Sequence, residues 1–317
     1  MKLTTKIVIS DLEHADITEE RRVFDQNSLT VDWRDCRTEA EVIEGCQDAD
    51  ILLVQYAAMT RKAIESLPNL KHIIRYGVGV DTVDLAAAAE NGIEVSNVPD
   101  YGMHDVADHA VAHTLNLHRK IYMANKEVKE GKWDYISTIP IKRMSHCVVG
   151  VIGFGRIGQE YAKRMRSFGC TIIAYDPFLK KHDDAEMVIL DELFMKSDII
   201  SIHCPAEGNI DLISDDALAK MKDGILIINV ARGGVVNEEA LEDALTSKKV
   251  GGYGTDVAKI EPIPMASPLL KHENVIITPH MAWYSEEAAQ ELKRKAAEEA
   301  VRFAKGEKVY YSVIKSS

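Results

Sequence analysis

Short apolar segments alternate with amphipathic segments over the first hundred residues of the chain. The alternation predicts strands over residues 6–10, 49–54, 72–76 and 93–97, and helices over residues 38–46, 60–67 and 84–90. Thr60 is a suitable N-cap and Pro68 a suitable stop for the second helix. Such alternation is typical of a parallel sheet with helices on both faces.

Pro99 interrupts this pattern, which resumes after a long helical stretch predicted over residues 104–122. Further strands are predicted over residues 148–152, 172–175, 199–203, 225–229, 251–256 and 275–278, followed by one amphipathic helix over residues 285–305. We therefore predict two doubly wound α/β domains. Residues 100–281 form one domain, which is inserted into a second domain made of residues 1–99 and 282–317.

A glycine motif follows the first strand of the inserted domain. The segment VVGVIGFGRIGQEYAKRMRSFGCTIIAYDP reads as strand, glycine turn, helix, strand and acid. Gly153 permits the tight turn, Gly155 lets the backbone approach a pyrophosphate, and Gly158 lets the helix pack on the strand. The N-terminus of that helix favours phosphate, and Asp176 favours the ribose hydroxyls of NAD over the 2′-phosphate of NADP.

Composition narrows the classes of partner. The net charge of −12 argues against binding to nucleic acid or to an anionic membrane, and no apolar run is long enough for a membrane span. The N-terminus does not resemble a signal peptide. Five scattered cysteines without paired spacing predict reduced thiols. We expect a cytoplasmic protein.

Three polar side chains follow predicted strands behind the glycine motif: Arg232, Glu261 and His280. Ligands bind at the carboxyl edge of an open parallel sheet, so these residues are candidates for a site there. An arginine can bind a carboxylate with two hydrogen bonds, and a carboxylate beside a histidine favours the protonated imidazole. Each residue alone has a plain structural explanation, but their order behind a nucleotide site favours chemistry.

With these residues and the segments around them, the chain resembles the D-isomer-specific 2-hydroxyacid dehydrogenases. The resemblance rests on YGVGVDTVDL, NVPDYGMHDVADHAV, GVIGFGRIG, YDP, HCP, NVARGGVVNEEAL, GTDVAKIEP and TPHMAWYSE, and it covers nearly the whole chain. It implies a Rossmann NAD-binding domain inserted into a flavodoxin-like substrate domain. The segment TPHMAWYSE, with Trp283 after His280, is similar to the branch of the family that contains the C-terminal-binding-protein corepressors.

The resemblance also implies site residues. Arg232 would bind the substrate, Glu261 would be the acid–base partner and His280 the proton donor, while Val78, Gly79 and Trp283 would contact the substrate. The implied cofactor residues are Gly153, Gly155, Arg156, Ile157, Gly158, Asp176, His203, Cys204, Pro205, Val230, Ala231, Arg232, Asp256 and His280.

Other positions limit the substrate and the partners. Phosphoglycerate dehydrogenases typically have arginines where this chain has Gln55-Tyr56-Ala57-Ala58, and we expect no regulatory domain after the final helix; both argue against 3-phosphoglycerate. His109 and His113 share a helix face but lack the HExxH arrangement, so we expect no metal. The apolar helix that begins at His104 predicts a homodimer.

The expected function is hydride transfer between NAD(H) and a small 2-ketoacid or D-2-hydroxyacid, of the glyoxylate or hydroxypyruvate kind. The alternative is a corepressor-like interaction protein that is gated by NAD and has little turnover. Arg232, Glu261 and His280 favour the enzyme.

Overall fold

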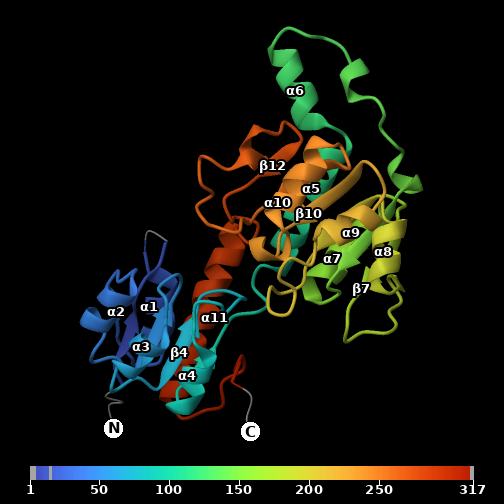
Figure 1. The fold of residues 1–317 in the computed structure, drawn as a ribbon. Helices are drawn as coiled ribbons and strands as arrows, with labels where there is room; N and C mark the ends of the chain where they lie inside the picture. Colours follow the sequence, from blue (N-terminus) through green and yellow to red (C-terminus); the bar gives the residue numbers. More distant parts are fainter. Residues whose placement is uncertain (1–4, 14–15, 315–317) are drawn as a thin grey trace. The chain divides into compact units, whose positions relative to one another are not determined.

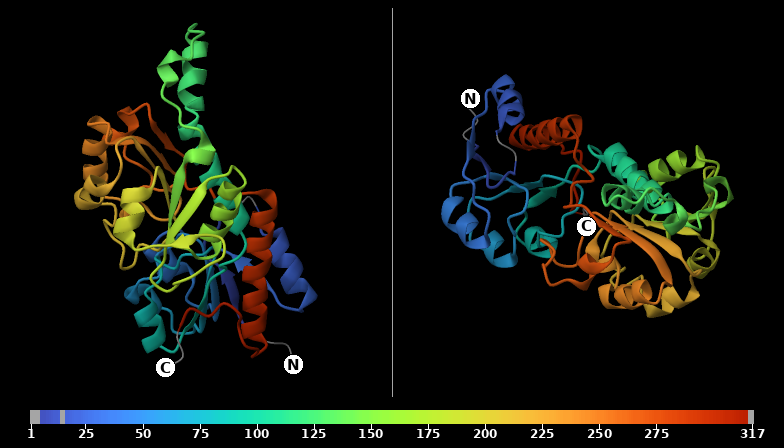
Figure 2. Two further views of the ribbon diagram at one scale, coloured as in Figure 1. Left: turned by 90° about the vertical axis from the view of Figure 1, so that its right-hand side faces the viewer. Right: turned by 90° about the horizontal axis from the view of Figure 1, so that it is seen from above.

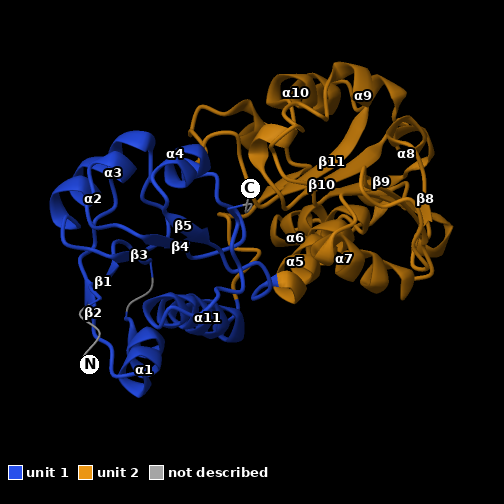
Figure 3. Ribbon diagram, turned by 90° about the horizontal axis from the view of Figure 1, so that it is seen from below, with its two compact units in different colours: residues 1–102, 285–317 blue, residues 103–284 orange. Residues whose placement is uncertain are grey.

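The computed structural model describes residues 5–13 and 16–314, and the chain divides into two compact units (Figure 3). Unit 1 comprises Met1–Gly102 and Ser285–Ser317, and unit 2 comprises Met103–Tyr284. The two divisions fall after residues 102 and 284, where the sequence placed them after 99 and 281. A long helix begins just after each division, which explains why the sequence pattern changes there.

Unit 1 contains a five-stranded sheet with the order β2-β1-β3-β4-β5, and every pairing in it is parallel. This is the flavodoxin-like order. The helices α2, α3 and α4 cover one face, and α1 and α11 cover the other (Figures 1 and 3). The elements are β1 (Ile7–Ile9), α1 (Thr18–Gln26), β2 (Val31–Trp33), α2 (Glu39–Gly45), β3 (Ile51–Val54), α3 (Arg61–Glu65), β4 (His72–Arg75), α4 (Leu85–Glu90), β5 (Glu94–Ser96) and α11 (Glu286–Ala304).

Two elements of unit 1 were not predicted from the sequence. The segment of α1, TEERRVFDQ, is mostly charged, and its buried residues are Glu20, Val23 and Phe24. Strand β2 is a short edge strand that is only partly buried, so it lacks the continuous apolar run of a central strand. Both elements are stabilised by packing on their neighbours rather than by a strong local pattern.

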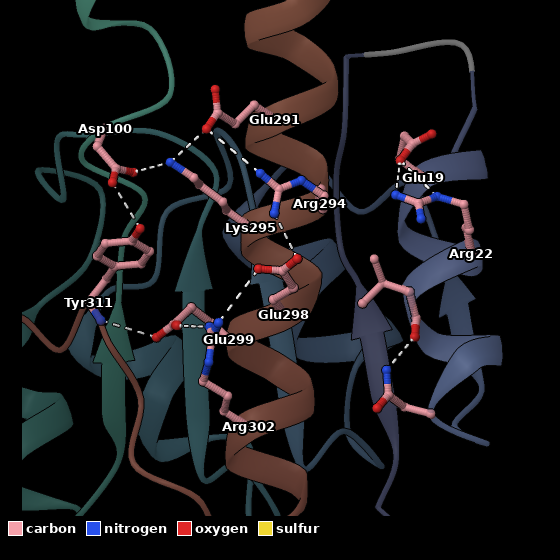
Figure 4. Close-up of polar contacts among 12 residues, drawn as sticks. Glu19, Arg22, Asp100, Glu291, Arg294, Lys295, Glu298, Glu299, Arg302 and Tyr311 are labelled. Atoms are coloured by element: carbon pink, nitrogen blue, oxygen red, sulfur yellow. Dashed lines mark hydrogen bonds and ion pairs between the residues drawn. The ribbon is translucent and has the colours of Figure 1, made fainter.

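A polar network fastens the C-terminal segment to the rest of unit 1 (Figure 4). The carboxylate of Asp100 accepts hydrogen bonds from the Lys295 ammonium at 2.7 Å and from the Tyr311 hydroxyl at 2.9 Å. The buried carboxylate of Glu299 accepts from the backbone N–H groups of Tyr310 and Tyr311. A buried carboxylate needs such partners because an unpaired one is costly.

Unit 2 contains a seven-stranded parallel sheet with the order β12-β11-β10-β9-β6-β7-β8. Counted from β6, this is the Rossmann order with one added strand, and the order reverses between β6 and β9. Helices α8, α9 and α10 cover one face, and α5 and α7 cover the other (Figure 3). The elements are α5 (Met103–His118), α6 (Ile121–Lys129), β6 (Val148–Ile152), α7 (Arg156–Arg166), β7 (Thr171–Tyr175), β8 (Glu186–Met187), α8 (Leu190–Lys196), β9 (Ile199–Ile202), α9 (Asp215–Lys220), β10 (Ile225–Asn229), α10 (Glu238–Thr246), β11 (Val250–Thr255) and β12 (Val275–Ile277); four 3-10 helices, Ile136–Thr138, Met144–His146, Gly233–Val235 and Pro268–Lys271, lie between them.

The single helix predicted over residues 104–122 is wrong in one respect. Helix α5 ends at His118, and α6 begins at Ile121 after Lys120, whose backbone is left-handed with φ of 53°. A left-handed residue cannot continue a right-handed helix, so the direction of the chain changes there. The buried face of α5 packs against α7, β10 and β11 within unit 2. Helix α6 has no buried residue and extends away from the rest of unit 2 (Figures 1 and 2).

The five cysteines are free and buried. Burial is the main cause that raises the pKa of the Cys46 thiol to about 12, so this thiol is a poor nucleophile at neutral pH. In the part of the chain that the structure describes, no helix combines the length and the apolar character needed to cross a membrane.

Candidate active site

The glycine turn between β6 and α7 has the geometry that a dinucleotide site requires. Gly153 has φ of 85°, and a side chain at this position would collide with the backbone of His203 and Cys204. By contrast, the position of a side chain on Gly155 is open space. Gly155 is also the N-cap of α7, so the free N–H groups of the first helical turn, which includes Arg156 and Ile157, lie beside this opening. These residues fit an NAD pyrophosphate.

Asp176 lies just after β7 and is tied to the glycine turn. One carboxylate oxygen accepts a hydrogen bond from the N–H of Phe154, and the other accepts from the N–H of Phe178, both at 2.9 Å. A carboxylate oxygen has two lone-pair sites, so each can accept a further hydrogen bond. These free acceptor sites are compatible with the ribose hydroxyls of NAD, and a contact of Asp176 with the cofactor stays a prediction.

The segment after β9 presents its backbone, rather than the ring of His203, toward the glycine turn. The Nε2 atom of His203 is 2.8 Å from the hydroxyl of Ser201, and the ring contacts Tyr161 at a centroid distance of 5.2 Å. Burial lowers the pKa of His203 to about 3, so its imidazole is neutral. Cys204 is buried and Pro205 is exposed. The predicted contact of residues 203–205 with NAD would therefore use main-chain atoms.

Arg232 follows β10 in a loop that is held by Asn229. The Asn229 side chain donates to the Arg232 carbonyl at 2.9 Å and accepts from the Ala231 N–H at 3.1 Å. The next residue, Gly233, packs directly against the backbone of Ala258. The loop that carries Val230, Ala231 and Arg232 is thereby placed beside the loop that leads to Glu261.

Glu261 and His280 form a hydrogen-bonded pair. The Nδ1 atom of His280 is 2.7 Å from one carboxylate oxygen of Glu261, and the N–H of Ala258 donates to the other at 3.0 Å. Burial acts to raise the pKa of Glu261, but these two hydrogen bonds and the nearby charges of His280 and Arg232 outweigh it and lower the pKa. Glu261 is therefore ionised at neutral pH and can orient the imidazole.

The carboxylate of Asp256 holds the loop that carries His280. It accepts from the N–H groups of Met281 at 2.9 Å and Ala282 at 2.7 Å, while the Asp256 carbonyl accepts from the N–H of His280 at 2.9 Å. His280 has a left-handed backbone with φ of 54°, which is unfavourable for a residue other than glycine. The hydrogen bonds to Asp256 stabilise this conformation. A cofactor contact of Asp256 stays a prediction.

The predicted substrate residues belong to both units. In unit 1, Val78 and Gly79 lie in the loop that follows β4, where the carbonyl of Val78 accepts from the Asn97 side chain at 2.6 Å. The side chain of Val78 is 43% exposed. In unit 2, the Trp283 ring lies 5.6 Å from the Tyr284 ring, nearly at right angles to it. Their contact with a substrate stays a prediction.

Thr278 and the two histidines of α5 were missed as members of this site. The Thr278 hydroxyl contacts Asp256, His109 and His113. The sequence did show that His109 and His113 share a helix face, but it gave no sign of what that face contacts. Within residues 5–13 and 16–314, no group of three or more histidine, cysteine or acidic side chains has the arrangement of a metal site.

Comparison with known proteins agrees with this geometry. Residues 111–282 match the NAD-binding domain of the D-isomer specific 2-hydroxyacid dehydrogenases. The chain is 36% identical over 299 residues to a hydroxypyruvate reductase from Blautia hydrogenotrophica, with 90% of each chain covered. It is 38% identical over 287 residues to a D-3-phosphoglycerate dehydrogenase from Archaeoglobus fulgidus, which covers 89% of this chain, and it spans about half, 54%, of that longer relative.

Among solved structures, a D-lactate dehydrogenase from Aquifex aeolicus in complex with NAD and lactic acid has a TM-score of 0.90 and 28% identity, over 98% of this chain and 100% of that one. The chain therefore belongs to the D-isomer specific 2-hydroxyacid dehydrogenase family. It is an NAD-dependent oxidoreductase of that family, with a Rossmann NAD-binding domain joined to a second parallel-sheet domain. The expected fold, cofactor and class of enzyme are confirmed.

Proposed function

We propose that this protein reduces a small 2-ketoacid with NADH, or oxidises the corresponding D-2-hydroxyacid, through Arg232, Glu261 and His280. The observation that carries the proposal is the 2.7 Å contact between His280 and Glu261 in the NAD-binding unit. The loop of Arg232 lies against the loop of Glu261, so a cation for the substrate and a donor for its oxygen occur in one region. A purely structural ion pair on the surface would not require the loop of Arg232 beside the pair of Glu261 and His280.

In this proposal each side chain has a separate task. The guanidinium of Arg232 binds the substrate carboxylate with two hydrogen bonds. The Nε2–H of His280 donates its proton to the carbonyl oxygen as that oxygen gains negative charge. Glu261 fixes the orientation of the imidazole and stabilises its protonated form. Bound NADH supplies the hydride.

Glyoxylate and hydroxypyruvate are the substrates that we propose. The Blautia relative is a hydroxypyruvate reductase and covers nearly the whole chain. The segment Gln55-Tyr56-Ala57-Ala58 contains no arginine for a substrate phosphate, and the Tyr56 hydroxyl donates to the carboxylate of Glu13 at 2.7 Å. Turnover of a panel of 2-ketoacids with NADH, including 3-phosphohydroxypyruvate, tests this choice.

The same panel tests the corepressor-like alternative. Slow turnover of every ketoacid, together with tight NADH binding, would favour an NAD-gated interaction protein. The position of Trp283 after His280 supports placement in the corepressor-like branch, while the relatives described above are metabolic dehydrogenases. We therefore propose catalysis as the principal role and a cytoplasmic location as the simplest one.

Asp176 is expected to set the preference for NADH. The wild-type protein should use NADH at least about tenfold more efficiently than NADPH, a difference of about 1.4 kcal/mol, because a carboxylate repels the 2′-phosphate. Asp176→Ala should lower the ratio of kcat/KM with NADH to kcat/KM with NADPH. Steady-state kinetics with both cofactors measure it, and equal use of the two by the wild type would contradict the assignment.

A matched variant separates charge from loop structure at this position. Asp176 also holds the glycine turn through Phe154, so Asp176→Ala is expected to weaken binding of both cofactors. Asp176→Asn retains an acceptor oxygen for Phe154 but removes the charge. If charge sets the preference, Asp176→Asn should narrow the ratio as much as Asp176→Ala.

We also propose a homodimer, with helix α6 and the segment after it as the contact. The predicted apolar face of α5 is buried inside unit 2, so it is not the exposed surface that the sequence suggested. A group of exposed large apolar side chains lies further along the chain, at Ile121, Tyr122, Val128, Trp133, Tyr135, Ile136 and Ile139. Such a concentration of exposed apolar side chains is typical of an interface.

The dimer is tested by light scattering at micromolar concentration, with and without NAD. The wild type is expected to have the mass of two chains, and the double variant Trp133→Ser, Tyr135→Ser is expected to shift toward one chain. Phe178→Ser is a control, because Phe178 is 95% exposed but lies on a different part of unit 2. A wild-type monomer under both conditions would contradict this proposal.

A further inference from the structure

The Thr278 hydroxyl connects helix α5 to the loop that carries His280. Its oxygen is 2.6 Å from a carboxylate oxygen of Asp256, 2.8 Å from Nε2 of His109 and 3.2 Å from Nε2 of His113. The two histidines are one helical turn apart on α5, and their rings meet edge to face at 4.8 Å. Three side chains from two distant parts of the sequence therefore converge on one hydroxyl.

The chemistry of the partners fixes the direction of these hydrogen bonds. The Thr278 hydroxyl donates to the carboxylate oxygen of Asp256 that also accepts from the N–H of Met281. The lone pairs of the hydroxyl oxygen then accept from the Nε2–H groups of His109 and His113. Burial first, and the neighbouring His109 second, lower the pKa of His113 to about 4, so His113 donates from a neutral ring.

The position of Asp256 matters because the His280 loop depends on it. The same oxygen that accepts from Thr278 also accepts from the N–H of Met281, and the other accepts from Ala282. These bonds flank His280, which holds a left-handed backbone. A rotation of the Asp256 carboxylate would therefore displace the imidazole from Glu261 and from the reacting oxygen.

We propose that His109 and His113 are positioning residues, which act through Thr278 and Asp256 to hold His280 in its catalytic orientation. The proposal rests on the role of His280 as proton donor. It assigns a task to the histidine pair of α5 that neither metal binding nor core packing describes. The side chain of His113 also fills the space against Gly254 on β11, which fixes α5 against the sheet at this point.

Thr278→Val tests the proposal most directly, because it removes the hydroxyl and nearly preserves the shape. We expect kcat for ketoacid reduction to fall roughly tenfold, while the Kd for NADH, measured by fluorescence titration, changes less than about twofold. Thr278→Ser should recover most of the lost turnover. The pH–rate profile of Thr278→Val should also shift relative to wild type, because the contact between His280 and Glu261 is disturbed. A purely structural role would not produce this combination.

Variants of His109 provide the second test. His109→Leu should lower kcat in the same way, and His109→Gln, whose amide can donate to Thr278, should recover part of it. His104→Ala is the matched control on the same helix, since His104 is exposed and its neighbours are Glu160 and Arg164. Melting temperatures identify any variant whose activity is lost through unfolding. Among folded variants, a higher kcat for His109→Gln than for His109→Leu supports the hydrogen bond to Thr278, and equal values contradict it.

The outcomes distinguish this inference from the proposed function. If His280→Ala is inactive but Thr278→Val and His109→Leu match the wild type in kcat and pH profile, the positioning role is wrong and the proton donor stands. If His280→Ala retains wild-type turnover, the assignment of the donor fails first. A fall in kcat for Thr278→Val that Thr278→Ser does not recover would also overturn the inference.

Discussion

Replacing His280 by alanine is expected to lower the turnover of a 2-ketoacid with NADH by roughly a hundred- to ten-thousandfold. The reason is that the alkoxide formed by hydride transfer would have no positioned proton donor. The Kd for NADH should change little, because in the proposed mechanism the imidazole is held by Glu261 and acts on the substrate oxygen. Single-turnover kinetics and NADH fluorescence titration measure the two quantities on the same protein. Wild-type turnover in His280→Ala would rule out the proposed mechanism.

A second variant, Glu261→Gln, tests the contribution of the carboxylate charge. The lowered pKa of Glu261 means that the carboxylate is charged throughout the neutral range, and its charge favours a protonated partner. Reduction requires that partner to carry a proton. Without the charge, the fall of the reduction rate at rising pH should therefore begin at lower pH. An unchanged pH profile would show that Glu261 has only a structural part.

Replacing Arg232 by alanine is expected to raise KM for the ketoacid and to lower kcat, with a combined loss in kcat/KM of roughly a hundredfold or more. Hydrogen bonds to a charged group contribute about 1.5–3 kcal/mol each, and an arginine can form two with one carboxylate. The same contacts exist in the ground state and in the transition state, so both constants change. Steady-state kinetics over a wide range of ketoacid concentration measure them.

Arg232→Lys is the control for charge without geometry. Lysine keeps the positive charge but cannot present two parallel N–H groups, so an intermediate loss is expected. With an uncharged substrate analogue that lacks the carboxylate, the wild type and Arg232→Ala should have similar kcat/KM values. Equal KM values for the ketoacid in the wild type and Arg232→Ala would show that the carboxylate binds elsewhere.

Elements with a strong local pattern were predicted from the sequence alone. The buried central strands β3, β6 and β10 are continuous apolar runs, and α2 and α3 begin at threonine N-caps, so each carries its own signal. The charged helix α1 and the edge strand β2 carry weak signals and were missed. The end of α5 was also missed, because the left-handed turn at Lys120 has no glycine to mark it.

The glycine turn with Asp176 is local in the sequence, and a single strand–turn–helix unit builds it, so the sequence by itself determined the class of fold and the kind of cofactor. The order of Arg232, Glu261 and His280 behind that turn indicated the chemistry through resemblance to a family. Only the tertiary structure showed which side chains hold the loop that carries His280. The contacts of Thr278 with the two histidines of α5 join residues more than 160 positions apart, and no sequence pattern reports which face of α5 meets β10 and β11. That choice depends on packing, since the space against Gly254 admits His113 and thereby brings His109 to the Thr278 hydroxyl.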